Sequence, residues 1–159
     1  MLVLFSPDLD SLARLGLQLV GIVAPIVAVV AYRRNVKTRR AEWLSGLHAK
    51  FYEAETYKNI RHIVDNEPTE FASLRETVSA GGANKTVENF VDYLNFFEFI
   101  ASLWKLGQLS LDEIAMLFEY YLVNLTKHKF IQDFIDTQGF ESLAELLIAV
   151  KKRRKRVRA

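Results

Sequence analysis

An uncharged, strongly apolar stretch constrains the fold of this chain more than any other feature. Residues 15–32 contain no charged side chain, and Gln18 is their only strongly polar one. A helix over these residues is roughly 27 Å long, close to the ~30 Å hydrocarbon core of a bilayer. Core helices of water-soluble proteins are seldom apolar all round over such a length. The sequence therefore predicts a transmembrane helix, which we place at residues 11–32.

The basic residues that follow this stretch predict its orientation. Residues 33–40 contain no acidic side chain, whereas Asp8, Asp10 and a single basic residue, Arg14, precede the stretch. Because Lys and Arg are enriched on the cytoplasmic side of membrane helices, we expect a single-pass protein of the bacterial inner membrane, with its N-terminus outside and its C-terminal domain in the cytoplasm. The basic juxtamembrane cluster, a candidate contact for lipid, consists of Arg33, Arg34, Lys37, Arg39 and Arg40.

One face of the predicted membrane helix carries small residues at three- and four-residue spacing. They are Gly21, Ala24, Ala28 and Ala31. Small side chains let two membrane helices approach closely, so this face is a candidate for helix packing and self-association. Alanine is common in membrane helices, and an ordinary lipid-facing surface stays an equal alternative.

The rest of the chain predicts an all-α fold, in which the single N-terminal transmembrane helix continues into a small cytoplasmic helical bundle. Only 7 glycines and 3 prolines occur, and we find no apolar–polar alternation long enough for a strand. The absence of cysteine excludes disulfides and cysteine-bound metals. The predicted parts are a short extracytoplasmic N-terminus, the membrane helix, a basic juxtamembrane segment with a long first helix, the bundle and a polybasic tail, at residues 1–10, 11–32, 33–65, 66–150 and 151–159.

Breaks in the apolar pattern divide the cytoplasmic part into helices. Pro68 disfavours helix in the residue before it and ends the first helix near Asp65. Residues 79–84 predict a loop, and Ser110 with Glu113 has the spacing of a capping box. Helices are expected over about residues 69–78, 86–106, 111–135 with a bend near 126–129, and 140–150.

Residues 93–101 read Tyr-Leu-Asn-Phe-Phe-Glu-Phe-Ile-Ala and are followed by Gly107. This segment resembles a bacterial family of domains of unknown function, which carries a Leu-Asn-Phe-Phe-Glu-x-Ile-Ala motif, one N-terminal transmembrane helix and a small cytoplasmic helical domain. The resemblance covers residues 87–150 well and implies the helical fold without implying an activity. Family members often carry a basic residue where this chain has Asp133, Asp136 and Gln138.

A polar stripe runs along the predicted helix that carries this motif. Asp92, Asn95, Glu98 and Ser102 recur at three- and four-residue spacing among aromatic residues. A partly buried carboxylate needs a partner, so we predict that Glu98 pairs with Arg61 and fixes two helices in register, while Asn95 bonds nearby groups. The alternative, that Glu98 is a general acid or base, is disfavoured because no second catalytic group is evident.

No residue pattern indicates an enzyme. His48, His62 and His128 form no His-x-x-x-His or Glu-x-x-His pair, so neither a zinc helix nor a di-iron bundle is predicted. The chain contains no Gly-x-Gly-x-x-Gly fingerprint and no Walker loop. We therefore expect no catalytic residue, no metal and no cofactor.

The charges are strongly segregated along the chain. Residues 41–150 hold 8 basic and 17 acidic side chains, whereas the predicted tail is basic throughout. Its cations are candidates for contact with lipid or phosphate: Lys151, Lys152, Arg153, Arg154, Lys155, Arg156 and Arg158. We favour the anionic membrane surface, at about 1 kcal/mol per basic residue, over a solvated tail or nucleic acid, since the run lacks aromatic residues for base stacking.

Together these patterns favour a membrane-anchored cytoplasmic interaction module, a scaffold or adaptor that contacts membrane lipids and a protein partner or a second copy of itself. One alternative is an oligomerising membrane effector or sensor in a bacterial stress or phage-defence system. Nucleic-acid binding through the basic tail is a further alternative that we do not favour.

Overall fold

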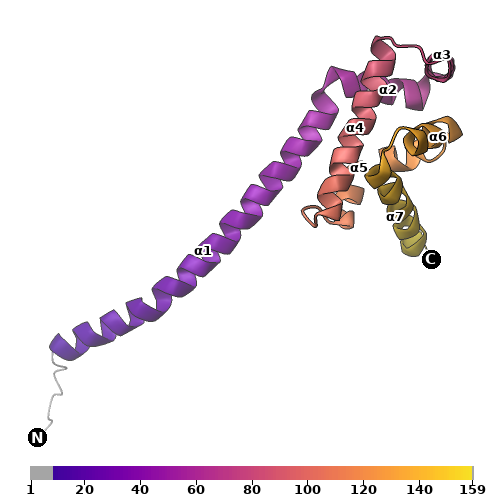
Figure 1. Cartoon of the computed structure of the whole chain (residues 1–159). Helices are drawn as coiled ribbons and strands as arrows, with labels where there is room; N and C mark the ends of the chain where they lie inside the picture. Colours follow the sequence, from indigo (N-terminus) through magenta and orange to yellow (C-terminus); the bar gives the residue numbers. More distant parts are fainter. Residues whose placement is uncertain (1–8, 159) are drawn as a thin grey trace, which may run out of the picture. The chain divides into compact units, whose positions relative to one another are not determined.

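The computed structural model describes the backbone of residues 9–158 and the side chains of residues 27–29 and 31–157. All regular structure of the described backbone is helical, which confirms the all-α prediction. The chain forms two compact units, one ending at Leu47 and the other beginning at His48. The helices are α1 (Leu9–Glu53), α2 (Glu55–Asn66), α3 (Pro68–Ser79), α4 (Lys85–Lys105), α5 (Leu111–Leu125), α6 (Lys129–Thr137) and α7 (Glu141–Arg158), as shown in Figure 1.

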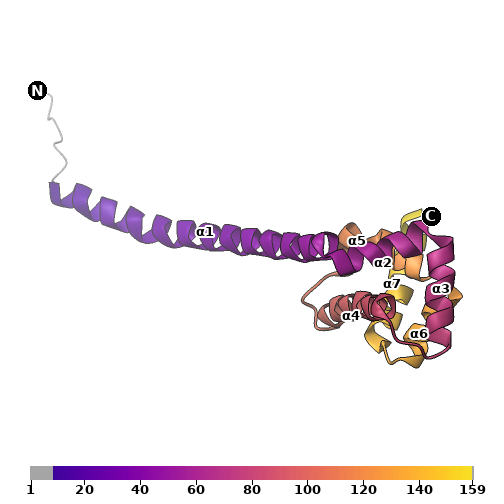
Figure 2. The same cartoon turned by 90° about the horizontal axis from the view of Figure 1, so that it is seen from above.

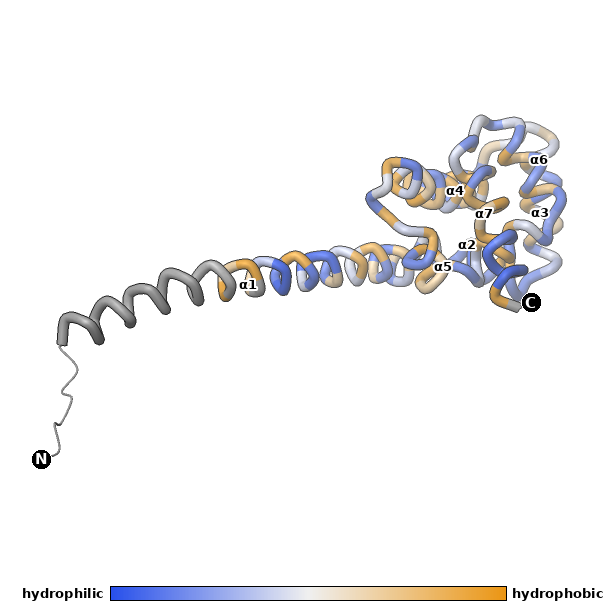
Figure 3. The backbone as a smooth tube through the Cα atoms, turned by 90° about the horizontal axis from the view of Figure 1, so that it is seen from below, coloured by the Kyte–Doolittle hydropathy of each residue, from blue (hydrophilic) through white to orange (hydrophobic). Residues whose placement is uncertain are grey.

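Helix α1 contains the stretch in which the membrane segment is predicted. Its backbone is helical from Leu9 onward, but most side chains of residues 11–32 lie outside those that the structure describes. No helix among the described residues combines the length and the apolar character needed to cross a bilayer. Of the small-residue face, Gly21 and Ala24 also lie outside the described side chains, whereas Ala28 and Ala31 are exposed. Along the coloured part of α1, hydrophilic and hydrophobic residues alternate (Figure 3).

The prediction that the first helix continues to Asp65 is wrong. Helix α1 stops at Glu53, and α2 starts at Glu55 after Ala54, whose φ of −65° and ψ of 119° are extended rather than helical. The backbone therefore turns at Ala54, and the last carbonyls of α1 lose their helical donors. No glycine or proline marks this break, and the apolar spacing runs straight through it.

The second compact unit begins at His48 rather than at residue 66, so α2 belongs to it. Within this unit α4 packs against α2, α3 and α7, and α7 packs against α4, α5 and α6 (Figures 1 and 2). The largest fully buried side chains are mainly aromatic and come from the end of α1, from α4 and from α5. They include Phe51, Phe90, Tyr93, Phe97 and Phe118.

Phe51 is the hub of this aromatic core. It is 0% exposed, and its ring centroid lies 5.0–5.3 Å from those of Phe96, Phe97, Phe118 and Tyr121. Edge-to-face and offset contacts between aromatic rings add about 0.5–1.5 kcal/mol each to the gain from burial. The last turn of α1 is thereby fixed to α4 and α5, which gives the compact unit a rigid core.

The predicted helix ends in the compact unit are mostly confirmed. Asn84 caps α4, its side chain accepting the Val87 N–H at 2.9 Å, and the Ser110–Glu113 capping box opens α5. The helix predicted to bend near residues 126–129 is divided there into α5 and α6. Gly139 follows α6 with a φ of +80°, a conformation that favours glycine.

The prediction of a separate polybasic tail is wrong. Helix α7 continues through the basic run as far as Arg158. Its first turn carries Glu141, and its last turns carry only cations and Val157. This polarity complements the helix dipole, because cations near a helix C-terminus stabilise it by about 0.3–1 kcal/mol each.

Candidate functional site

Glu98 connects two helices, but through a partner that differs from the predicted one. Its two carboxylate oxygens accept the backbone N–H groups of Ser142 at 3.2 Å and Leu143 at 2.7 Å. These N–H groups belong to the first turn of α7, where no carbonyl of the helix can accept them. Glu98 thus caps α7 from the side of α4, and its negative charge lies at the positive end of the helix dipole.

The predicted Glu98–Arg61 pair is therefore wrong, and so is the role predicted for Asn95. Asn95 is exposed on α4 and has no hydrogen bond to protein among the described residues. Asp92, one turn earlier on α4, is also exposed. The even spacing of the polar stripe hid this difference, because Glu98 is half-buried whereas Asp92 and Asn95 are exposed.

Arg61 instead stabilises the turn between α1 and α2. Its guanidinium donates to the carbonyls of Phe51 and Tyr52, the latter at 3.1 Å. The same group lies 4.7 Å from the centre of the Phe51 ring and 4.9 Å from that of Tyr52, a cation–π arrangement. Nearby, burial and a hydrogen bond with Tyr52 raise the pKa of Tyr121 to about 12. Arg61 therefore compensates the carbonyls left free where α1 ends.

A polar network that the sequence analysis missed joins α2 to the end of α5. The buried Asn124 side chain donates to Asp65 and accepts from the Lys127 ammonium at 2.7 Å. The Asn124 amide thus bridges the Asp65 carboxylate and the Lys127 ammonium group, and this bridge fixes the position of Lys127. The available signal was an asparagine in the apolar segment of residues 121–125, since buried polar groups are nearly always hydrogen-bonded.

The charge of Asp65 contributes to the raised pKa values of two tyrosines. Burial, followed by the charge of Asp65, raises the pKa of Tyr93 well above its usual value. The charge of Asp65 is the largest cause that raises the pKa of Tyr120, with a hydrogen bond to Asp65 contributing. Both phenols therefore ionise less readily than a free tyrosine. Asp65 acts electrostatically on Tyr120 and is linked to Lys127 through Asn124.

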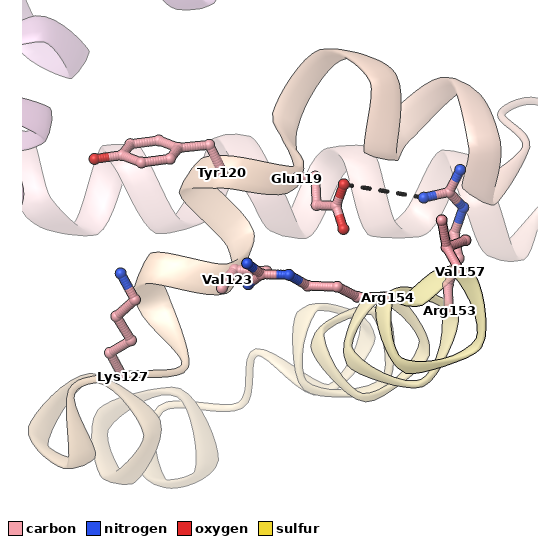
Figure 4. Close-up of a pocket in the computed structure, with 7 residues that line it drawn as sticks. All are labelled: Glu119, Tyr120, Val123, Lys127, Arg153, Arg154 and Val157. Carbon is pink, nitrogen blue, oxygen red and sulfur yellow. Dashed lines mark ion pairs between the residues drawn. The ribbon is translucent and has the colours of Figure 1, made fainter. Parts of the chain in front are cut away.

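Tyr120 and Lys127 form part of a groove between α5 and α7. The groove has a volume of about 410 Å³ and is shown in Figure 4. Helix α5 and the turn after it contribute one side, and the basic end of α7 contributes the other. The lining residues are Glu119, Tyr120, Val123, Lys127, Arg153, Arg154 and Val157.

The cation at the centre of the α5–α7 contact is Arg153. It forms an ion pair with Asp112 at 2.7 Å and a longer one with Glu119 at 4.0 Å, which is the dashed line in Figure 4. Arg153 is half-buried, as is its neighbour Arg154. The predicted lipid- or phosphate-contacting cations are thus not equivalent. Arg153 forms ion pairs with residues of α5. The exposed cations of the run are Lys151, Lys152, Lys155 and Arg156.

His128 follows this groove in sequence and lies between α5 and α6. Burial, and then repulsion by Lys127, lower the pKa of His128 from its ordinary value of 6.5. Its ring lies against Phe71 at a centroid separation of 4.5 Å. The neutral imidazole therefore acts as an aromatic packing group between α3 and the start of α6.

A second groove lies between α3 and α6, with a volume of about 520 Å³. It includes Asp133 and Gln138, two of the positions at which the resembled family often carries a basic residue. The cations Arg75 and Lys129 also line it, so opposite charges are mixed along its walls. Its lining holds two cations and one acid, a smaller excess of positive charge than that of the α5–α7 groove.

No family model, curated protein or solved structure matches this chain. The resemblance noted for residues 87–150 therefore stays a prediction.

Proposed function

We propose that this chain is a membrane-anchored helical interaction module: residues 11–32 hold it in the bacterial inner membrane, and the compact unit binds a protein partner on the cytoplasmic side. It acts as a scaffold or adaptor without chemistry of its own. The groove between α5 and α7 is the observation that carries the proposal. Its lining combines apolar and cationic side chains on two helices that pack against each other.

Exposed apolar residues around this groove support a role in binding. Tyr120 is 59% exposed and Val157 is 72% exposed, and both line the groove. Met116, at 72%, lies one helical turn before Tyr120 on the same face of α5. Exposed apolar side chains gathered around a concave surface are typical of protein-binding sites.

The anchoring part of the proposal rests on the charge pattern of α1. The uncharged residues 15–32 are long enough to cross the hydrocarbon core, and the following cluster has the composition of a cytoplasmic flank. The cations Arg33, Arg34, Lys37 and Arg39 are exposed. Anionic lipid headgroups are therefore proposed as a second class of partner, which the basic cluster contacts.

Membrane extraction at alkaline pH tests the anchor. We expect the full chain to stay in the pellet and the double variant Val23→Lys, Ile26→Lys to be released, because each charge in the middle of a membrane helix costs about 2.5–3.5 kcal/mol. Leu106→Lys with Ile148→Lys is the matched control, since it places two lysines at exposed apolar positions of the compact unit. Release of the unaltered chain, or equal behaviour of the two variants, contradicts the anchor.

Co-purification from gently solubilised membranes tests the interaction. We expect a protein that copurifies with the full chain and is lost when Met116 and Tyr120 are both replaced by glutamate. The same replacements at Phe99 and Leu106, which are also exposed apolar residues, leave it bound. Equal loss with both pairs of replacements means that the α5–α7 groove is not the binding surface.

A further inference from the structure

We propose that the groove between α5 and α7 binds an acidic peptide segment that inserts an apolar side chain. This inference rests on the proposed function, because it names the chemistry of the partner that the interaction module binds. The segment lies against Tyr120, Val123 and Val157 with its apolar side chain and places its carboxylates near Lys127 and Arg154.

Charge complementarity determines the sign of the partner. Three cations line the groove, and Glu119 is the only acid among its lining residues. The surrounding chain is acidic, with 17 acidic and 8 basic residues between positions 41 and 150. An acidic partner is therefore repelled by the chain that precedes residue 151 and attracted to the basic end of α7, which lines the groove, and this increases both the association rate and the specificity.

Two of the three cations of the groove are held in place before a partner arrives. Lys127 donates to Asn124 at 2.7 Å, and Arg153 is held by Asp112 at 2.7 Å. Arg154, by contrast, has no carboxylate partner among the residues that the structure describes. It is the cation most available to an incoming carboxylate. Lys127 loses little entropy on binding because its side chain is fixed in advance. Together with Arg154 it forms the charged part of the site.

The apolar part of the site lies between these cations. Val123 is half-buried in α5, Val157 is exposed on α7, and the Tyr120 side chain is exposed. In Figure 4 the Arg154 side chain extends from α7 toward the side of the groove that carries Val123. A volume of about 410 Å³ accommodates a few side chains of a peptide.

The shape of the site favours a peptide over the other polyanions available to such a protein. Arg153 and Arg154 are half-buried in a concave surface, which a flat membrane reaches less readily than it reaches the exposed Lys151, Lys152 and Lys155. Single-stranded nucleic acid binds through several aromatic side chains on which successive bases stack. The groove offers one such side chain, Tyr120.

The test is a selection of random 16-residue peptides displayed on phage against the full chain in detergent. We expect the enriched peptides to carry several Asp or Glu residues around a Leu, Ile, Phe or Trp. Synthetic peptides of the enriched sequences then serve as probes in fluorescence anisotropy. Binding is expected to weaken at least tenfold in the double variant Lys127→Glu, Arg154→Glu, and to weaken with rising salt.

The matched control is Lys58→Glu with Lys85→Glu, which makes the same change of charge at exposed lysines of α2 and α4. It leaves peptide binding within twofold of the unaltered chain. Helical content by circular dichroism verifies that both double variants are folded. A second pair, Tyr120→Ala with Val157→Ala, tests the apolar part without changing the charge, and we expect it to weaken the same peptides at least fivefold.

Several outcomes overturn the inference. They are the absence of any enriched peptide, enrichment of basic or neutral peptides, and equal effects of the groove and control variants. The inference is also overturned if the groove residues bind anionic vesicles or single-stranded RNA more tightly than they bind the peptides. Self-association of the chain through these residues overturns it as well. Because peptide binding is measured in detergent, it is independent of the anchor: peptide binding without membrane retention contradicts only the anchor, and the reverse contradicts only the groove.

Discussion

Glu98 shows how one side chain can define the packing of a helix that follows it by more than forty residues. Its carboxylate satisfies two N–H groups at the start of α7. That Glu98 connects helices was predictable from the sequence, because a carboxylate among aromatic residues needs partners. Its partner was not predictable, since a pattern of side chains does not indicate which backbone N–H groups lack an acceptor.

Replacing this cap is expected to destabilise the compact unit. In Glu98→Gln the charge is lost and an NH₂ group faces a backbone donor, so the free energy of unfolding should fall by about 1 kcal/mol, the usual value of a helix cap. Urea denaturation followed by circular dichroism measures the change. Asp92→Asn, an exposed carboxylate on the same helix, is the control and should shift the midpoint little. Equal shifts for the two variants would show that Glu98 does not cap α7.

His128 is expected to make stability depend on pH. Its pKa is lowered in the folded chain, so the unfolded chain binds the proton more readily. The stabilisation from the neutral imidazole is therefore fully present above pH 6.5 and is lost as the pH falls below that value. Urea midpoints measured between pH 7.5 and pH 5 should decline less for His128→Gln than for the unaltered chain.

The causes of this shift can be separated by a second variant. Lys127→Gln removes the repulsion and leaves the burial, so it should reduce the decline only in part. An identical pH profile for the unaltered chain and His128→Gln contradicts the assignment.

At the level of elements, the turn at Ala54 is the helix boundary that the sequence did not predict. Most helix ends could be predicted because their signals act locally on the backbone. These signals are Pro68, the Ser110–Glu113 capping box and Gly139, which interrupt the apolar periodicity. The break between α1 and α2 carries no such signal. It depends on Arg61, ten residues from the Phe51 carbonyl that it binds, and on aromatic contacts that come from α4 and α5.

Arg61 is therefore expected to stabilise the compact unit more than an exposed cation does. Arg61→Ala removes two hydrogen bonds and the cation–π contacts, and we expect a loss of about 2 kcal/mol in the free energy of unfolding. Arg61→Lys should recover less than half, since an ammonium group lacks the planar fork that reaches two carbonyls. Lys58→Ala on the same helix should cost less than about 0.5 kcal/mol, as expected of an exposed pair with Glu55. The account of the turn fails if Lys58→Ala and Arg61→Ala cost the same.

The groove could be predicted from the sequence only in part. Two of its three cations, Arg153 and Arg154, belong to a run that stands out by composition, and a role in contacting anions was expected of that run. That the run is helical and faces α5 depends on the Arg153 contacts with Asp112 and Glu119, which lie far earlier in the chain. The sequence therefore indicated the charge of the site. The shape of the site could be known only from the folded structure.

At the level of the whole molecule, the proposals assign different tasks to the two compact units. Residues up to Leu47 contain the uncharged stretch and the basic cluster, and we assign to them the position in the membrane. Residues from His48 onward contain the aromatic core and the α5–α7 groove, and we assign to them the binding of a partner. Anchoring raises the local concentration of a binding module at the membrane, so even a weak groove can retain a partner there.

Labelling of introduced cysteines tests this arrangement most directly, because the natural chain contains none. Single variants Ser6→Cys and Ala83→Cys are expressed in bacteria, and spheroplasts are treated with a membrane-impermeant maleimide before and after permeabilisation. We predict that Ser6→Cys is labelled in intact spheroplasts and that Ala83→Cys is labelled only after permeabilisation. Labelling of Ala83→Cys in intact spheroplasts, or protection of both positions until permeabilisation, would contradict a single membrane span with the compact unit in the cytoplasm.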